Sequence, residues 1–227
     1  MLIEKIFDFI SHYHHHKISL YAKNLSCNIL VDVGCHKGDL LNSFLKTKKF
    51  TKFYCFEPQK RIFKYLKKKF KNNKKIEIHN YSLGDSHTKK RIYLSNLTSL
   101  STMSKINHKS VWFKIKKFIV GDKNETNLYQ LVNQKKIDTV FKNISLRNSF
   151  LKIDVEGYEF NVLLGAKNKI KEIPYVLIEK HTFSQYHNNF TLVHNFLKKN
   201  DFEVVKSFYY PTLHYKDVLY RNKKKGQ

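Results

Sequence analysis

Several residue types are scarce in this sequence of 227 residues, and each scarcity excludes a class of protein. With only 3 prolines and 7 glycines, no linker divides the chain, so we expect a single domain over residues 1–227. The cysteines Cys27, Cys35 and Cys55 are an odd number without a CxxC pair, which favours a reduced protein over a disulfide framework. No apolar run approaches the ~18 residues that span a bilayer. The sequence therefore predicts a cytoplasmic protein.

Acidic residues are also scarce. The chain has 18 Asp and Glu against 43 Lys and Arg, for a formal net charge of +25. A basic surface attracts polyanions through counterion release, so nucleic acids and anionic membranes are the partners to consider. Lysine is enriched together with Asn, Ile, Phe and Tyr along the whole chain, however, which is what an A+T-rich coding sequence produces. We interpret the charge as compositional and expect no specific nucleic-acid partner; peripheral membrane contact stays open, and the pattern indicates no oligomeric state.

Hydrophobic patterning predicts an alternation of strands and helices. Apolar runs bounded by turn residues predict strands at 28–33, 52–56, 75–79, 148–154 and 174–179. Helical periodicity occurs at 59–71, 158–170 and 190–200. This order is typical of a doubly wound, mostly parallel α/β sheet of the Rossmann-like class. Residues 1–25 begin as an amphipathic helix, 90–134 predict an insertion at the rim of the sheet on the substrate side, and the basic tail 221–225 is expected to fray.

The first predicted strand ends in a turn that could approach a ligand closely. Asp32 closes the strand, and Gly34, Cys35, His36 and Gly38 form the turn before a predicted helix. Glycine lets the backbone come close to a bound molecule, and the helix N-terminus offers unpaired N–H donors. A nucleotide-like cofactor fits such a crevice, although a plain tight turn has the same pattern.

The next two strand ends support the cofactor interpretation. Glu57, followed by Pro58, lies about 20 residues beyond the glycine turn, where a doubly wound fold places a carboxylate for ribose hydroxyls. Its structural alternative is an acid that favours a helix N-terminus. After the third strand, Ser82 and Leu83 begin a turn that would lie under an adenine ring.

The most specific segment is LKIDVEGYE, residues 151–159. Three carboxylates within six residues at the end of a buried strand, Asp154, Glu156 and Glu159, are costly to remove from water, so each needs a partner or a function. The later strand 174–179 ends in Glu179, and His181 follows it. Strand 174–179 is expected beside 148–154, which would place these side chains on one rim.

Together these segments resemble the FkbM family of methyltransferases. LKIDVEGYE with VLLGA resembles the family signature, VDVGCHKGD its cofactor loop, FEP its ribose-binding strand end and SLGD its third turn. The resemblance runs in order over about residues 29–181, except that His36 replaces a small polar residue. It implies a class I fold, S-adenosylmethionine as cofactor, and methyl transfer to a hydroxyl of a sugar, glycan or related surface or secondary metabolite. The residues implied to bind the cofactor are Asp32, Gly34, Cys35, His36, Gly38, Glu57, Pro58, Ser82, Leu83 and Asp154.

Methyl transfer to a neutral hydroxyl needs a base or a metal that lowers the pKa of that hydroxyl. The candidate catalytic residues are Asp154, Glu156, Glu179 and His181, and Asp154 is the first choice for organising the site. His181 has an unperturbed pKa of about 6.5 and could accept the proton. Alternatively, Asp154 and Glu179 could hold magnesium or calcium, so the use of a divalent metal stays open.

A histidine cluster near the N-terminus, His12, His14, His15 and His16, suggests a metal site at first sight. Adjacent histidines on one helix point in different directions, and no nearby cysteine or carboxylate completes a ligand set. We predict that these histidines lie on the surface.

Two other functions remain alternatives. An RNA methyltransferase is favoured by the charge and by Trp112 and Phe113, which could stack on bases. Against it, no Asn/Asp-Pro-Pro-aromatic element follows the fourth strand, and no RNA-binding module is appended. A non-catalytic binding protein with the methyltransferase fold is the second alternative, and the joint retention of the glycine turn, Glu57 and Asp154 argues against it.

Overall fold

The structure is a computed structural model that describes residues 2–94, 101–104, 128–181, 190–211 and 215–226, with side chains from residue 10 onward. Trp112 and Phe113, and the segment that follows His181 up to residue 189, lie outside the described residues.

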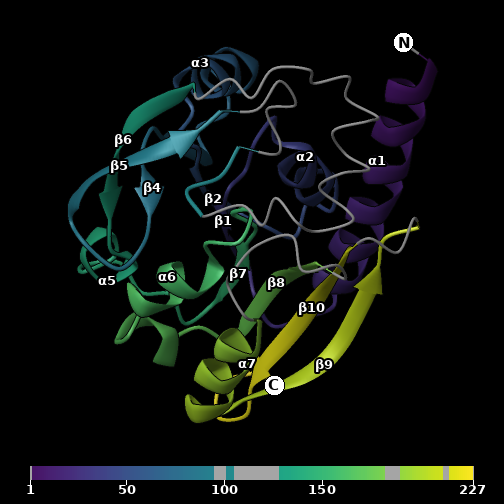
Figure 1. Ribbon diagram of the computed structural model, residues 1–227. Helices are drawn as coiled ribbons and strands as arrows, with labels where there is room; N and C mark the ends of the chain where they lie inside the picture. The colour runs from purple at the N-terminus through teal and green to yellow at the C-terminus, as the bar shows by residue number, and fades with distance from the viewer. Residues whose placement is uncertain (1, 95–100, 105–127, 182–189, 212–214, 227) are drawn as a thin grey trace.

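A seven-stranded sheet forms the centre of the molecule (Figure 1). Its strand order is β3-β2-β1-β7-β8-β10-β9. The bounds are β1 (Ile29–Val33), β2 (Lys52–Phe56), β3 (Ile76–His79), β7 (Ser149–Ile153), β8 (Tyr175–His181), β9 (Phe202–Tyr209) and β10 (Tyr215–Asn222). The first five strands in this order are parallel, and β10 is antiparallel to both β8 and β9. The expected doubly wound sheet is confirmed.

Helices cover both faces of this sheet. One face packs against α5 (Ile137–Val140), α6 (Glu159–Leu164) and α7 (Phe190–Lys199), and the other against α1 (Leu2–Lys23), α2 (Asp39–Lys46) and α3 (Lys60–Lys69). The central strands β1, β2, β7 and β8 are largely apolar because both of their faces are buried. In α3, Ile62 and Leu66 face the core and the lysines face solvent, as the periodicity predicts.

A second, three-stranded sheet lies at the side of the molecule opposite α1 (Figure 1). Its order is β4-β6-β5, with β4 (Ser82–Leu83), β5 (Thr88–Tyr93) and β6 (Tyr129–Lys135). Its strands β5 and β6 lie at the two ends of the insertion expected at 90–134, and β4 lies in the turn after β3.

Three predictions about the chain ends and helices were wrong in part. His14 is not on the surface: it is 1% exposed, and its Nε2 lies 2.6 Å from Oδ2 of Asp217 in β10. The tail does not fray at Arg221, which pairs with Tyr175 in the sheet and binds Glu203 at 2.7 Å. The helix expected at 158–170 ends at Leu164, and a 3₁₀ turn follows at 169–171. For His14 and Arg221 a partner distant in sequence decides the outcome.

The glycine of the VLLGA segment has a steric role. A Cβ on Gly165 would lie 2.0 Å from the backbone oxygen of Gly84, although Gly165 itself has an ordinary helical conformation. The amide of Asp138 also donates to the Gly165 carbonyl at 3.0 Å. The SLGD and VLLGA motifs therefore meet backbone to backbone and fix the small sheet against α6.

We predict that Gly165→Ala destabilises the fold by about 1–3 kcal/mol, because the added methyl overpacks this contact. Urea unfolding followed by circular dichroism measures the change. Lys167→Ala, an exposed change two residues away, should leave the midpoint nearly unchanged. Equal stabilities for Gly165→Ala and wild type would contradict the close approach.

Candidate functional site

A buried lysine links the neighbouring strands β1 and β7 at the centre of the sheet. Lys152 of β7 is 6% exposed and stands directly beside Asp32 of β1 in the parallel register. Its Nζ lies 3.5 Å from Oδ1 of Asp32, donates to Oδ2 of Asp154 at 2.9 Å and reaches the carbonyl of Gly34 at 3.3 Å. One ammonium group therefore holds together the β1 end, the glycine turn and the β7 end.

The electrostatics of this group follow from burial and mutual charge. Burial acts to lower the pKa of Lys152, but the charges of Asp154 and Asp32 outweigh it and raise that pKa. For Asp154, burial acts to raise the pKa, and the Lys152 ammonium together with hydrogen bonds holds it below its usual value. Burial raises the pKa of Asp32, and Lys152 opposes that shift. Lys152 is thus the counter-charge on which both carboxylates depend.

The glycine turn packs against the end of β7. Gly34 has φ +83°, and a Cβ there would lie 1.8 Å from the backbone oxygen of Asp154. His36 also has positive φ, at 42°, and burial lowers its pKa to about 4, so its imidazole is neutral near pH 7. Cys35 is buried beneath the turn and forms a side-chain hydrogen bond with Cys55. The described cysteines are all free thiols.

Glu57 closes the same crevice from the end of β2. Its Oε2 accepts the backbone N–H of His36 at 3.0 Å and its Oε1 accepts that of Gln59 at 2.8 Å. A carboxylate has about four acceptor positions, so these bonds leave capacity for two hydroxyl donors. Burial raises the pKa of Glu57 to about 7. The Glu57 carboxylate, the glycine turn and the N-terminus of α2 lie around one crevice. Together they fit a cofactor that contains a nucleoside.

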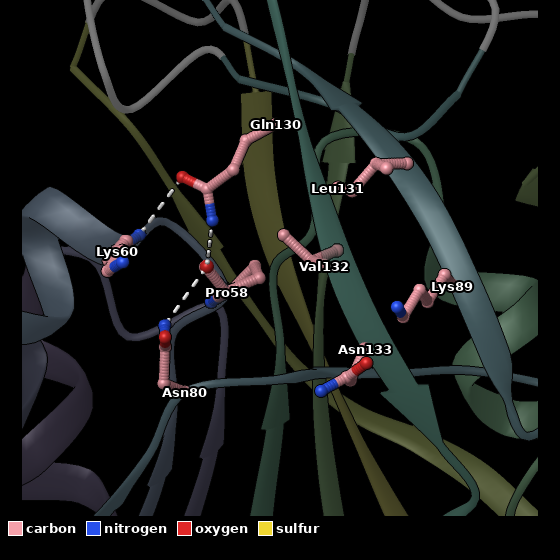
Figure 2. A pocket seen from close by; sticks show the side chains of 8 residues that line it. All are labelled: Pro58, Lys60, Asn80, Lys89, Gln130, Leu131, Val132 and Asn133. Carbon is pink, nitrogen blue, oxygen red and sulfur yellow. Dashed lines mark hydrogen bonds between the residues drawn. The ribbon is translucent and has the colours of Figure 1, made fainter.

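A pocket of about 290 Å³ lies next to Pro58 (Figure 2). Asn80 donates to the carbonyls of Glu57 and Pro58, and Gln130 of β6 donates to Pro58 and accepts from the amide of Lys60. The remaining lining residues are Lys89, Leu131, Val132 and Asn133. The pocket therefore extends outward from the Glu57 side of the crevice toward the small sheet.

Ser82 and Leu83 are buried in β4, where Ser82 Oγ donates to the carbonyl of Asn133 at 3.2 Å. The structure thus places both residues in the small sheet. Asn80, two residues earlier, is the residue of this segment that touches the Glu57–Pro58 backbone. A lone asparagine before a turn is common, so this position could not be singled out from the sequence pattern.

The predicted catalytic residues meet at the ends of β7 and β8, which pair in parallel as expected. Glu179 forms a side-chain hydrogen bond with Asp154, and His181 Nε2 lies 3.1 Å from Oε1 of Glu179 and 3.7 Å from Oε2 of Glu156. Burial, followed by the charges of Asp154 and Glu156, raises the pKa of Glu179 well above its usual value. Glu179 therefore favours its protonated form more than an ordinary glutamate does. All four side chains share one rim.

Glu159, the third carboxylate of the signature, has a structural explanation. Its Oε1 accepts the amides of Gly157 at 2.9 Å and Val155 at 3.3 Å, and so closes the turn before α6. Burial raises its pKa to about 7. Among the described residues, no three His, Cys, Asp or Glu side chains are arranged to hold a metal ion, and Lys152 already supplies a positive charge at Asp154.

Two contacts at this rim were not predicted. Thr102 donates to the carbonyl of Glu156 at 2.5 Å, which ties the insertion to the site. His14 pairs with Asp217, which stands opposite Glu179 in the antiparallel register of β10 and β8.

Lys152 could have been found from the sequence, because a lysine inside an otherwise apolar strand is a buried charge that requires partners. The His14 pairing had no such signal.

We predict that Lys152→Met destabilises the protein by about 3–5 kcal/mol at pH 8, because it leaves Asp32 and Asp154 buried without a counter-charge. In the variant the folded-state pKa values of these carboxyls rise above those of the unfolded chain. Their charge then costs stability as pH rises, so part of the loss should be recovered at pH 5. Urea unfolding at both pH values tests this. The exposed variant Lys68→Met should change little at either pH, and an equal loss at both pH values for Lys152→Met would contradict the charge explanation.

Comparisons with known proteins agree with this geometry. The profile of the methyltransferase FkbM domain matches residues 32–204. The magnesium protoporphyrin IX methyltransferase from Synechocystis PCC 6803, solved with bound S-adenosylmethionine, superposes with a TM-score of 0.53 at 7% identity, over 95% of this chain and 81% of its own. Sp1610 from Streptococcus pneumoniae, in complex with S-adenosyl-L-methionine, gives 0.50 at 10% identity, over 91% and 71%.

A protein of the NADB-Rossmann superfamily from Streptococcus agalactiae gives a TM-score of 0.50 at 13% identity, over 92% of this chain and 67% of its own. At such identities these structures show the shared fold alone. A search of the curated proteins gave no match. No described helix is long and apolar enough to cross a membrane. With the domain profile covering most of the chain, the protein belongs to the FkbM methyltransferase family and is an S-adenosylmethionine-dependent methyltransferase.

Proposed function

We propose that this protein is an O-methyltransferase that methylates a hydroxyl of a sugar, glycan or related surface or secondary metabolite, in the cytoplasm. The observation that carries the proposal is the cluster of Asp154, Glu179, His181 and Glu156 on one rim, beside the glycine turn. A hydroxyl acceptor requires a group that takes its proton, and this rim supplies one. An already nucleophilic acceptor would not need such a cluster.

In this proposal His181 is the base. Its Nε2 lies next to Glu179, whose pKa is raised by burial, and near Glu156, whose carboxylate would stabilise the positive charge that the imidazole gains with the proton. Asp154 is held by Lys152 and Glu179 at the centre of the rim and orients the acceptor hydroxyl. When bound, S-adenosylmethionine supplies an electrophilic methyl group that a hydroxyl oxygen can attack.

The cofactor residues act on the opposite side of the crevice. Glu57 accepts hydrogen bonds from the ribose hydroxyls through its remaining acceptor positions, and the glycine turn with Gly34 and Gly38 lets the backbone approach the ligand. His36, neutral near pH 7, stands where the family carries a small polar residue and offers a hydrogen bond there.

We predict that Glu57→Ala weakens the binding of S-adenosylmethionine by about 1.5–3 kcal/mol at pH 8, since a charged acceptor is lost. Because the pKa of Glu57 lies at about 7, wild-type affinity should rise between pH 6 and pH 8 as the carboxylate ionises. Glu57→Gln, which cannot ionise, should flatten this rise.

Isothermal titration calorimetry measures these affinities. Glu77→Ala, which removes a partly exposed carboxylate on the neighbouring strand, is the matched control and should bind as wild type does. Unchanged affinity in a folded Glu57→Ala variant would remove the ribose role.

We predict that Asp154→Asn abolishes methyl transfer and that His181→Ala lowers its rate by about 10²-fold or more, the range for loss of a general base. The assay follows tritium from labelled S-adenosylmethionine into the carbohydrate fraction of a cell extract, and mass spectrometry identifies the O-methyl sugar. His194→Ala, an exposed histidine of α7, should retain full activity.

Full activity in both Asp154→Asn and His181→Ala would reject the proposed site. Loss of wild-type activity on chelation, with recovery on adding magnesium, would instead assign the activation of the hydroxyl to a metal. Label that appears only in RNA would reject the glycan acceptor in favour of the RNA alternative.

A further inference from the structure

One face of the β5–β6 hairpin is exposed, cationic and aromatic. We call it the outer face and define it by Lys89, Arg91, Tyr93, Tyr129, Leu131, Asn133 and Lys135, which alternate with inward residues along the two strands. Tyr93 is 43% exposed, Tyr129 48% and Leu131 59%. An exposed cluster of large side chains on a small sheet is typical of a binding surface.

The charge of the outer face has one sign. The β5 and β6 strands contain four basic residues and no acidic one. Arg91 stacks on the ring of Tyr129 at 4.6 Å, and Lys135 lies over the ring of Tyr81 at 4.4 Å. Stacking holds these cations in fixed positions without neutralising them, so they remain available to an anion.

The same face leads into the pocket beside Pro58. Lys89, Leu131 and Asn133 line the pocket, and Figure 2 shows the ammonium of Lys89 and the carboxamide of Asn133 directed toward the space beside Pro58 and Asn80. No acidic side chain lines it. Cation, carboxamide and apolar surface together suit a ligand that carries both hydroxyls and negative charge.

The outer face also connects to the catalytic rim. Tyr93 at the end of β5 exchanges two backbone hydrogen bonds with Thr102, at 2.9 and 3.1 Å. Thr102 in turn donates to the carbonyl of Glu156, which neighbours His181. Hydrogen bonds therefore link the end of the outer face to the rim that carries His181.

We propose that the outer face is the acceptor-binding surface and that the acceptor is an anionic oligosaccharide, bearing carboxylate or phosphate groups. The inference deepens the proposed function and rests on it. The tyrosine rings pack against sugar rings, Asn133 hydrogen-bonds hydroxyls, and Lys89, Arg91 and Lys135 pair with the anionic groups.

The arrangement of the tyrosines favours a glycan over single-stranded RNA. Proteins that bind single strands offer aromatic rings to successive bases. Tyr93 and Tyr129 stand directly opposite one another in the antiparallel register, and Arg91 already covers a ring face of Tyr129. The described hairpin thus provides one aromatic position rather than a series.

A glycan array tests the proposal. It carries uronate-containing, sialylated and phosphorylated oligosaccharides, each beside its uncharged counterpart, and a single-stranded oligouridylate is measured in parallel at physiological salt. We expect wild type to prefer anionic over uncharged glycans, and the double variant Arg91→Ala/Tyr129→Ala to lose roughly tenfold or more in affinity. The uronate and phosphate spots distinguish the source of the charge.

Lys216→Ala/Tyr209→Ala is the matched control, because it removes another cation stacked on an exposed tyrosine, at 4.8 Å, from the β9–β10 hairpin. It should bind glycans as wild type does. Absence of anionic preference, equal losses in the two double variants, or tighter binding of oligouridylate than of any glycan would overturn the inference. Calorimetry with S-adenosylmethionine should give wild-type affinity for both variants, so a failure here is distinct from a failure of the cofactor site.

Discussion

The site depends on one buried ammonium group. Lys152 is placed between Asp32 and Asp154 and also reaches the carbonyl of Gly34, so the positions of three segments are coupled through it. Removing one partner of a buried ion pair costs several kcal/mol of stability. The positions of the three segments therefore depend on Lys152 being present. The same charge lowers the pKa of Asp154, whereas burial and the neighbouring carboxylates raise the pKa of Glu179.

The two functional sides of the crevice are electrostatically different. On the cofactor side, Glu57 is held by backbone amides alone, and burial brings its pKa to about 7. On the rim of β7 and β8, carboxylates, a lysine and a histidine balance one another at distances of 2.9 to 3.7 Å. In the proposed mechanism, a hydroxyl-binding carboxylate and a proton-accepting cluster need such different surroundings, since one must stay fixed and the other must take up charge.

Segments outside the matched domain complete the site. The FkbM profile covers residues 32–204, whereas α1 and β10 lie before and after it. Both reach the rim: His14 pairs with Asp217, and Asp217 stands opposite Glu179. The β5–β6 hairpin, inside the profile, reaches the rim through Thr102. The matched domain thus contains the crevice formed by Glu57 and the glycine turn, and α1 and β10 reach its rim from outside the match.

The sequence by itself determined the alternation of strands and helices, the glycine turn and the position of Glu57, because these depend on periodicity and short-range spacing. It also brought Asp154, Glu156, Glu179 and His181 to one rim, since parallel strands place their carboxyl ends along the same edge.

Only the tertiary structure decided the rest. The burial of His14 requires Asp217, the raised pKa of Glu179 depends on burial and on the charge of Asp154, and the outer face of the hairpin requires the pairing of Tyr93 with Tyr129. Each of these depends on a partner more than 20 residues away in the chain. The environment that fixes protonation and exposure is created by long-range packing, and local sequence patterns do not specify it.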